Sequence, residues 1–262
     1  MSCEIDPRLC PIGVFDSGVG GLSVLGEAVR QLPHEDFIYF GDTYNAPYGT
    51  KAPEQVRELA FGIVESFCAR RVKAVVIACN TATAEAAKEL RAHYSFPIIG
   101  MEPALKPASE LEGPGLRLVL ATPGTLSSEK YASLYARFGQ NAVSLPCPGL
   151  MDFVESGDRG SPALRDYLEH LLQPYLHENV TAVVLGCTHY PFIRPLIASF
   201  FPESTRILDG NAGTVRQLRR VLRQKDLLKT EGTGTVTLET SGNDQTLTLM
   251  KAMFEEAKEM IS

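Results

Sequence analysis

The stretch Ala74-Val-Val-Ile-Ala-Cys79-Asn-Thr81 decides the fold, because it recurs as Ala182-Val-Val-Leu-Gly-Cys187-Thr-His189, 108 residues further along the chain. Each copy is an apolar run that ends in a cysteine followed by polar residues. A looser repeat precedes each copy, since Ile12-Gly-Val-Phe-Asp16-Ser-Gly is echoed by Leu118-Val-Leu-Ala-Thr122-Pro-Gly124. The chain is therefore predicted to consist of two related halves.

Short apolar segments alternate with amphipathic ones, which is typical of βα units and a parallel sheet covered on both faces. The predicted strands are Ile12–Phe15, Phe37–Phe40, Ala74–Ala78, Ile98–Gly100, Leu116–Ala121, Ala142–Leu145, Ala182–Leu185 and Arg206–Leu208. The predicted helices are Leu22–Leu32, Pro53–Arg70, Ala82–His93, Ser128–Phe138, Pro162–Leu176 and Pro191–Phe201. We therefore predict an α/β fold with two pseudo-symmetric parallel-sheet domains that face each other across a cleft. Ligands of such sheets bind at the carboxyl ends of the strands.

The tail after Asp209 predicts a helix, a strand over Gly234–Thr240 and a closing helix over Asn243–Met260. This tail is too short to fold alone, so we expect it to complete the N-terminal half. The expected domains are residues 1–99 together with 211–262, and residues 100–210.

Composition and charge narrow the function classes. Of the 262 residues, 44% are hydrophobic and 21% are charged, as in ordinary globular proteins. The net charge of −6 argues against general nucleic-acid binding. No apolar stretch approaches the roughly 20 residues of a membrane span, and the acidic N-terminus does not resemble a secretory signal. A cytoplasmic protein is expected, and a homodimer is one arrangement that the sequence leaves open.

The six cysteines, at positions 3, 10, 68, 79, 147 and 187, form no C-x-x-C pair and do not cluster with histidines. This pattern fits neither a zinc site nor a disulfide framework, so no metal is expected. A single free cysteine is usually a small buried hydrophobe. The repeat favours function for Cys79 and Cys187, each expected at the start of a helix whose N-terminus lowers the pKa of the thiol and leaves the thiolate accessible.

A glycine-rich turn, Asp16-Ser-Gly-Val-Gly-Gly21, follows the first predicted strand. The backbone N–H groups of such a turn can grip a carboxylate or phosphate. It is not the dinucleotide fingerprint, because Ser23 stands where the third glycine belongs. Asp16 is equally consistent with a helix cap or turn residue. Taken alone, the turn is weak support for a ligand site.

Other polar residues follow predicted strands or helices. The long loop Gly41–Gly49 is either a surface loop or a wall of a substrate site, and Thr122 occupies the corresponding region of the second half. Glu155 is either a site carboxylate or a solvated acid. His189 lies two residues after Cys187 and would be a natural partner to tune or reprotonate its thiol.

Together these motifs resemble glutamate racemase, of the aspartate/glutamate racemase family, from about Ile12 to the C-terminal helix. The matching segments, in order, are Asp16-Ser-Gly-Val-Gly-Gly21, Pro47-Tyr-Gly49, Ala78-Cys-Asn-Thr-Ala82, Ala121-Thr-Pro-Gly-Thr125 and Gly186-Cys-Thr-His-Tyr-Pro191. Each segment is weakly specific, but the set is highly specific. The segment Asp209-Gly-Asn-Ala departs mildly from the family pattern.

The resemblance implies interconversion of L- and D-glutamate without pyridoxal phosphate or metal, and a supply of D-glutamate for bacterial peptidoglycan. It places the catalytic acid–base pair on Cys79 and Cys187, with Asp16 assisting the first, His189 assisting the second, and Glu155 as a further supporting carboxylate. The substrate-binding residues it implies are Asp16, Ser17, Pro47, Tyr48, Gly49, Asn80, Thr81, Thr122, Thr188 and His189.

The expected chemistry explains why two matched thiols are needed. Racemisation removes the α-proton from one face of the substrate and delivers a proton to the other. A single base would tend to return its own proton, whereas a pseudo-two-fold repeat supplies two bases on opposite faces. No cofactor is expected, and no lysine within the motifs marks a Schiff base. Donors from Ser17, Asn80, Thr81 and Thr188, arranged around the substrate's α-carboxylate, would stabilise the carbanionic character that develops.

Two alternatives remain open from the sequence. One is a racemase of aspartate or another acidic amino acid on the same scaffold. The other is a two-lobed protein that binds a small acid without turning it over. Matched thiols in both halves favour catalysis over binding alone.

Overall fold

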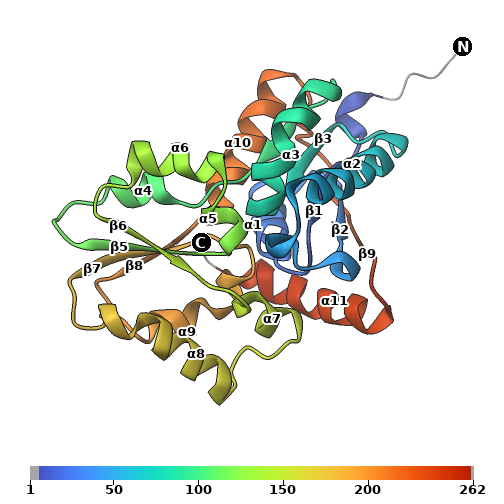
Figure 1. The fold of residues 1–262 in the computed structure, drawn as a ribbon. Coiled ribbons are helices and arrows are strands. Elements are labelled where there is room, and N and C mark those ends of the chain that lie inside the picture. The colour runs from blue at the N-terminus through green and yellow to red at the C-terminus, as the bar shows by residue number, and fades with distance from the viewer. Residues whose placement is uncertain (1–5, 261–262) are drawn as a thin grey trace, which may run out of the picture.

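The computed structural model describes residues 6–260, in which two fully parallel sheets are flanked by helices (Figure 1). Cys3 and the first residues, judged above not to form a secretory signal, lie outside this range. The strands are β1 Ile12–Asp16, β2 Phe37–Gly41, β3 Ala74–Ile77, β4 Ile98–Gly100, β5 Leu116–Ala121, β6 Ala142–Pro146, β7 Val180–Leu185, β8 Arg206–Asp209 and β9 Val236–Thr240.

The two sheets repeat one topology. The first has the strand order β4-β3-β1-β2-β9 and the second β6-β5-β7-β8, which read backwards is β8-β7-β5-β6. Strands β1 to β4 therefore correspond in order to β5 to β8, and all pairings are parallel. Strands β3 and β7, which precede the two repeated cysteines, hold equivalent places beside the central strands. The predicted pair of parallel α/β sheets is confirmed.

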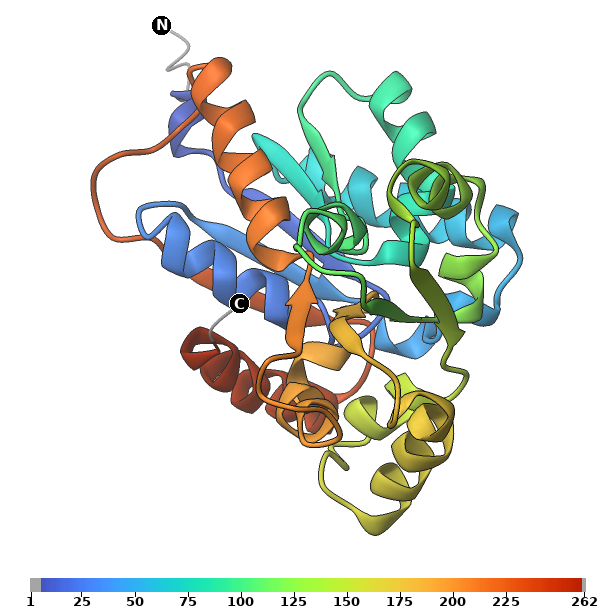
Figure 2. The same ribbon diagram turned by 90° about the vertical axis from the view of Figure 1, so that its left-hand side faces the viewer.

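The helices lie on both faces of each sheet, as Figures 1 and 2 show. The longer ones are α1 Leu22–Gln31, α2 Pro53–Ala69, α3 Asn80–His93, α6 Glu129–Phe138, α8 Pro162–Leu172, α10 Asn211–Gln224 and α11 Asp244–Glu259. The short ones are α4 Leu105–Ser109, α5 Pro123–Leu126, α7 Leu150–Glu155 and α9 Arg194–Ala198. The 3₁₀ turns are η1 Pro7–Leu9, η2 Thr43–Asn45, η3 Tyr48–Thr50, η4 Gln173–Tyr175 and η5 Tyr190–Ile193.

Strand β1 shows why these apolar runs become buried central strands. Successive side chains of a strand point to opposite faces. Val14 accordingly lies in the core formed with α1, α10 and α11, whereas Phe15 lies in the core formed with α2 and α3. Both side chains are essentially inaccessible to solvent. Because both faces are covered, a site must form at the ends of the strands, and ligands of parallel sheets bind at the carboxyl ends.

The C-terminal tail adds to the first sheet. Strand β9 pairs with β2 in register from Phe37↔Val236 to Gly41↔Thr240. Helix α11 follows and packs with α10 against α1, burying Met250 and Met253 in the shared core. The strand that the sequence predicted in this tail is therefore present, at the edge of the N-terminal sheet.

Two helix predictions are wrong in extent. The helix predicted over Pro162–Leu176 ends at Leu172, and the chain continues as the 3₁₀ turn η4, which contains Pro174. The helix predicted over Pro191–Phe201 is the 3₁₀ turn η5 followed by the short α9, in which Pro195 occupies the first turn. Proline lacks the N–H that a continuing helix requires, which explains both interruptions. No helix within residues 6–260 is long and apolar enough to cross a membrane.

Candidate active site

A small cavity lies where loops from the carboxyl ends of both sheets meet. Its volume is about 10 Å³, enough for about one water molecule. Both repeated cysteines line it, although each is less than a tenth exposed. The lining residues are Ser17, Gly49, Cys79, Asn80, Thr81, Thr122, Thr125, Met151, Gly186, Cys187, Thr188 and His189. The halves are therefore closed over the site.

Cys79 stands at the N-cap of helix α3, directly after β3. Its sulfur accepts a hydrogen bond from the backbone N–H of Ala82 at 3.4 Å and donates one to Ser17 Oγ at 3.7 Å. The expectation that the helix end lowers the pKa of this thiol is wrong for the closed structure. Burial raises the pKa well above its ordinary value, and the charge of Asp16 adds to the increase. The N–H and hydroxyl contacts oppose this shift but do not outweigh it.

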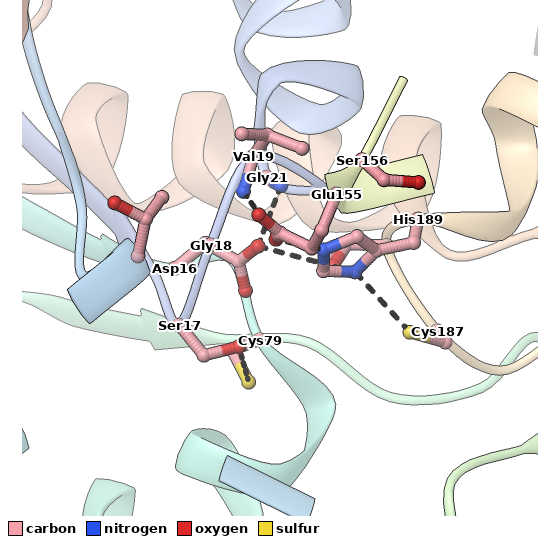
Figure 3. A network of polar contacts seen from close by, with 12 residues as sticks. Asp16, Ser17, Gly18, Val19, Gly21, Cys79, Glu155, Ser156, Cys187 and His189 are labelled. Atoms are coloured by element: carbon pink, nitrogen blue, oxygen red, sulfur yellow. Dashed lines mark hydrogen bonds and ion pairs between the residues drawn. The ribbon is translucent and has the colours of Figure 1, made fainter. Parts of the chain in front are cut away.

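Cys187 has different partners. It is followed by a turn and the 3₁₀ segment η5, so no α-helix begins at this thiol as the sequence predicted. Instead, Nδ1 of His189 lies 3.5 Å from the sulfur, and Nε2 of the same ring lies 2.6 Å from Glu155 Oε1 (Figure 3). Burial alone lowers the pKa of His189, but Cys187 and Glu155 raise it well above its ordinary value.

The glycine-rich turn after β1 holds two carboxylates of the protein itself. The N–H of Val19 donates to Glu155 Oε1 at 2.8 Å, and the N–H of Gly21 donates to Asp16 Oδ2 at 2.8 Å (Figure 3). A Cβ at Gly18 would lie 1.7 Å from Glu155 Oε1, so only glycine allows this approach. The turn therefore does hold carboxylates, but these two N–H groups bind side chains of the protein rather than a ligand.

Asp16 is completely buried beside the second half of the molecule. Besides Gly21, Thr188 Oγ1 donates to its Oδ2 at 3.4 Å, while Oδ1 has no hydrogen-bond partner among the described residues. Burial raises the pKa of Asp16, an effect opposed by the charge of His189 and by the Gly21 N–H. A carboxyl group with a raised pKa and an unsatisfied oxygen is suited to exchange protons with its surroundings.

Hydroxyl and amide groups complete the cavity wall. Thr81 Oγ1 lies 3.3 Å from both Thr122 Oγ1 and Thr125 Oγ1, which joins the two halves across the cleft. The side-chain amide of Asn80 is buried, and within residues 6–260 neither its oxygen nor its nitrogen has a hydrogen-bond partner. Buried polar groups are normally satisfied, so this amide is available to a small polar molecule.

Most of the residues expected at the site line the cavity, and four do not. Asp16 and Glu155 lie behind it, in contact with Thr188 and His189. Pro47 and Tyr48 precede Gly49 without lining the cavity themselves. The hydroxyl of Tyr48, expected to face a substrate, donates instead to Asp42 Oδ2 at 2.6 Å, and burial raises its pKa.

Sequence reasoning did not select three lining residues, Thr125, Met151 and Gly186. Thr125 and Gly186 stand inside the motifs Ala121–Thr125 and Gly186–Pro191, whereas Met151 carries no signal in the sequence because its short helix α7 shows no helical period. Among the described residues, the side chains of His, Cys, Asp and Glu form no cluster of three that could hold a metal ion.

Two thiols that face one cavity between two parallel α/β sheets are the arrangement expected of a two-base racemase. Comparison with known families agrees with this class. A sequence profile described as Asp/Glu/Hydantoin racemase matches residues 12–218. The chain belongs to this family, and it is therefore an isomerase of the racemase class.

Individual relatives point to one member of the family. A glutamate racemase from Clostridium novyi is 48% identical over 255 residues, which cover 95% of this chain and 98% of the relative. The crystal structure of glutamate racemase isoform RacE1 from Bacillus anthracis superimposes with a TM-score of 0.84 at 31% identity, covering 95% and 94% of the two chains. Escherichia coli glutamate racemase, solved with L-glutamate and the activator UDP-MurNAc-ala, gives 0.83 at 30% identity and 95% coverage of both chains.

Proposed function

We propose that this enzyme is a glutamate racemase, and that Cys79 and Cys187 exchange protons with opposite faces of the substrate's α-carbon. One observation supports this most directly. Each thiol lies two residues beyond the end of its strand, the two strands hold equivalent places in two repeated sheets, and both thiols line the same cavity. The pseudo-symmetry of the sheets would give each thiol its own side of a molecule bound between them. The relatives that share most of this chain's length supply the identity of the substrate.

The reaction balances with the thiols alone. The thiolate of one cysteine takes the α-proton, and the electron pair of the broken C–H bond remains on the substrate as a carbanion. The thiol of the other cysteine then delivers its proton to the opposite face. The first cysteine ends as a thiol and the second as a thiolate, so the reverse reaction begins from that state. No redox step or external group is required.

Neighbouring acid–base groups would set the charge of each thiol. Asp16 lies near Cys79 and has a raised pKa, so it would hold a proton for that thiol to use. His189 contacts Cys187, and its own raised pKa favours a thiolate–imidazolium pair there. Glu155 would keep the ring of His189 in place from the far side. A catalytic base is most effective when its pKa is near the working pH, and a neighbouring acid–base group can move the pKa of a thiol toward that value.

The developing negative charge needs donors around the substrate carboxylate. The hydroxyls of Ser17, Thr81 and Thr188 and the unsatisfied amide of Asn80 line the cavity and come from both halves. Donors fixed in a site that excludes water stabilise such charge far better than donors in solution. We propose that these residues, together with Gly49 and Thr122, bind the substrate and that no cofactor takes part.

Wider roles follow from the proposed activity. D-Glutamate made in the cytoplasm would serve bacterial peptidoglycan synthesis. We also propose that two domains close on the substrate, one formed by residues 1–99 with 211–262 and the other by residues 100–210. A homodimer remains one arrangement for the whole molecule.

A racemase of aspartate is the second candidate. Purified protein without added cofactor should change the circular dichroism of L- or D-glutamate toward that of the racemate. In heavy water it should also exchange the α-proton of both glutamate enantiomers faster than that of either aspartate enantiomer. Exchange restricted to aspartate would transfer the assignment to that substrate, and binding of glutamate without exchange would support a two-lobed binding protein.

Replacing either thiol tests the mechanism. Cys79→Ser and Cys187→Ser should each lower kcat for racemisation by about a thousandfold, because one face loses its base. Each variant should keep α-proton exchange of the single enantiomer whose proton faces the remaining thiol. Cys68→Ser is the matched control, since this cysteine is exposed and remote from the cavity. Full racemisation by either single variant would refute the two-base mechanism.

A further inference from the structure

A second buried carboxyl group lies beside the site without lining it. Asp42 directly follows β2, is 3% exposed, and its backbone N–H donates to the carbonyl of Asp16 at 3.0 Å. Its side chain accepts hydrogen bonds from Tyr48 Oη at 2.6 Å, Ser241 Oγ at 2.7 Å and Asn45 Nδ2 at 3.0 and 3.1 Å. Both carboxyl oxygens are therefore committed to holding other parts of the chain.

One of these contacts fixes a wall of the cavity. Tyr48 is buried and contacts Asp42, and the next residue, Gly49, lines the cavity. A Cβ added to Gly49 would lie 3.0 Å from Thr122 Cβ, so this glycine touches the opposite half directly. The hydrogen bond from Tyr48 thus determines how near the Gly49 backbone comes to the second half and to any substrate between them.

A second contact of Asp42, with Ser241, reaches the C-terminal tail 199 residues away. Ser241 follows β9, and its hydroxyl donates to Asp42 while accepting from the N–H of Tyr44 at 3.0 Å. Beside it, Thr240 Oγ1 and Thr43 Oγ1 lie 2.7 Å apart, and the N–H of Ser241 donates to the carbonyl of Gly41 at 3.2 Å. The loop that carries Tyr48 and Gly49 is therefore clamped between β2 and the tail.

We propose that Asp42 and Ser241 are positioning residues for the substrate site, acting through Tyr48 and the Gly49 backbone. This assignment rests on the proposed racemase function, because it concerns how that site holds its substrate. Gly49 would touch the substrate before and during the reaction, so loosening it weakens binding of the ground state and the transition state alike. Loss of such uniform binding raises KM and leaves kcat nearly unchanged.

The far end of the same strand supplies a matched control. Asp36 precedes β2 and also binds the tail, accepting from Thr235 N and Oγ1 at 2.9 and 2.6 Å and pairing with Lys229 Nζ at 2.7 Å. Its contacts tie β9 to β2 just as those of Asp42 do, but at the end of the sheet opposite the cavity. A change at Asp36 therefore weakens docking of the tail without touching the loop before Gly49.

The experiment compares Asp42→Asn and Ser241→Ala with Asp36→Asn and Thr235→Ala. An asparagine at position 42 keeps one acceptor oxygen, so at least one of its donors loses its partner. We expect KM for glutamate to rise about tenfold in Asp42→Asn and about threefold in Ser241→Ala, with kcat changed less than about threefold. The Asp36 and Thr235 variants should lower Tm while keeping KM at the wild-type value.

Hydrogen exchange of peptides covering residues 43–51 gives a readout that needs no substrate. The amides of this loop should exchange faster in the Asp42 and Ser241 variants and at the wild-type rate in the Asp36 and Thr235 variants. Equal KM changes in both pairs, or a loosened loop with unchanged KM, would overturn the proposal. If the wild-type protein did not racemise glutamate, the proposed function would fail, whereas an unchanged loop would refute the clamp on its own.

Discussion

Cys79 and Cys187 occupy equivalent places in the two sheets, but their neighbours differ in chemistry. Cys79 contacts only neutral groups: its thiol donates to Ser17 Oγ and accepts from the Ala82 N–H. The nearby charge of Asp16 also acts on it. Cys187 contacts a histidine whose other nitrogen binds Glu155. One thiol is thus served by a buried acid and the other by an imidazole. We expect the two directions of racemisation to depend differently on pH.

Glu155→Gln should change the pH dependence of stability. The pKa of His189 is raised in the folded protein, so its charge stabilises the fold fully below the unfolded value of about 6.5. That contribution is lost as pH rises through the raised pKa. Because Glu155 helps to raise it, the variant should be about 2 kcal/mol less stable at pH 6, with a smaller deficit at pH 9. Urea unfolding at both pH values measures the difference.

The control for this prediction is Glu169→Gln, which removes an exposed carboxylate of α8 in the same half. Its effect on the free energy of unfolding should be small at both pH values. A deficit of Glu155→Gln that stayed constant from pH 6 to pH 9 would show that the carboxylate stabilises the fold independently of the charge on His189.

At the scale of elements, the closure of the cleft depends on two loops that meet backbone to backbone. The turn η3 carries Gly49 from the first half, and α5 carries Gly124 from the second. A Cβ added to Gly124 would lie 2.7 Å from the carbonyl oxygen of Gly49. Because the obstacle is main chain rather than a flexible side chain, the loops must separate to accept a methyl group.

Gly124→Ala should therefore prop the halves apart and lower kcat/KM about tenfold, because the groups of the two halves no longer reach the substrate together. Gly62→Ala is its matched control, since a Cβ there meets nothing within 4 Å and the residue lies on the exposed face of α2. This control should gain about 0.5–1 kcal/mol of stability and keep wild-type kinetics. Steady-state kinetics beside thermal unfolding tests both, and equal kcat/KM in the two variants would contradict the role of the contact.

For the whole molecule, the closed cavity of about 10 Å³ is too small for an amino acid. The two halves must separate for substrate to enter, and the reaction must take place after they close again. Such motion is typical of sites assembled from two bodies. Burial in the closed state is the main cause of the raised pKa of Cys79, so this thiol loses its proton more readily while the halves are apart.

Alkylation of the cysteines by iodoacetamide should report this opening. The exposed Cys68 should react first, Cys79 and Cys187 more slowly at a rate set by opening, and Cys147, buried away from the cavity, last. Glutamate should slow the reaction of Cys79 and Cys187 only. Peptide mass spectrometry follows each residue separately. Protection of Cys68 by glutamate, or no protection of the paired cysteines, would contradict closure over the substrate.

Several parts of the fold follow from local sequence, and others do not. Strand β5 matches its predicted bounds, because a run that is apolar apart from Arg117 identifies a strand covered on both faces. The short helices α4, α5 and α7 were missed, since four to six residues are too few to show a helical period. The end of α8 and the start of α9 are misplaced by the sequence prediction although Pro174 and Pro195 are visible in it, because proline also occurs in first turns.

Some features of the candidate site also follow from local sequence, whereas others are seen only in the folded chain. The repeat around Cys79 and Cys187 predicts that both thiols lie at one cleft, because equivalent strands end at the equivalent edge of each sheet and the two halves are expected to face each other. The contact between Val19 N–H and Glu155 spans 136 residues, and that between Ser241 and Asp42 spans 199. No local pattern encodes such pairings, so these supporting contacts were found only in the folded chain.

The sequence by itself therefore determined the two-sheet architecture, the pair of thiols and the polar residues after each strand. These depend on the order of apolar and polar residues, which is local and repeated. Only the tertiary structure decided the electrostatics of the site. A helix end acts locally to lower the pKa of Cys79, but burial by distant segments has the larger effect and raises it. Desolvation depends on everything that surrounds a group, and that is set by the complete fold.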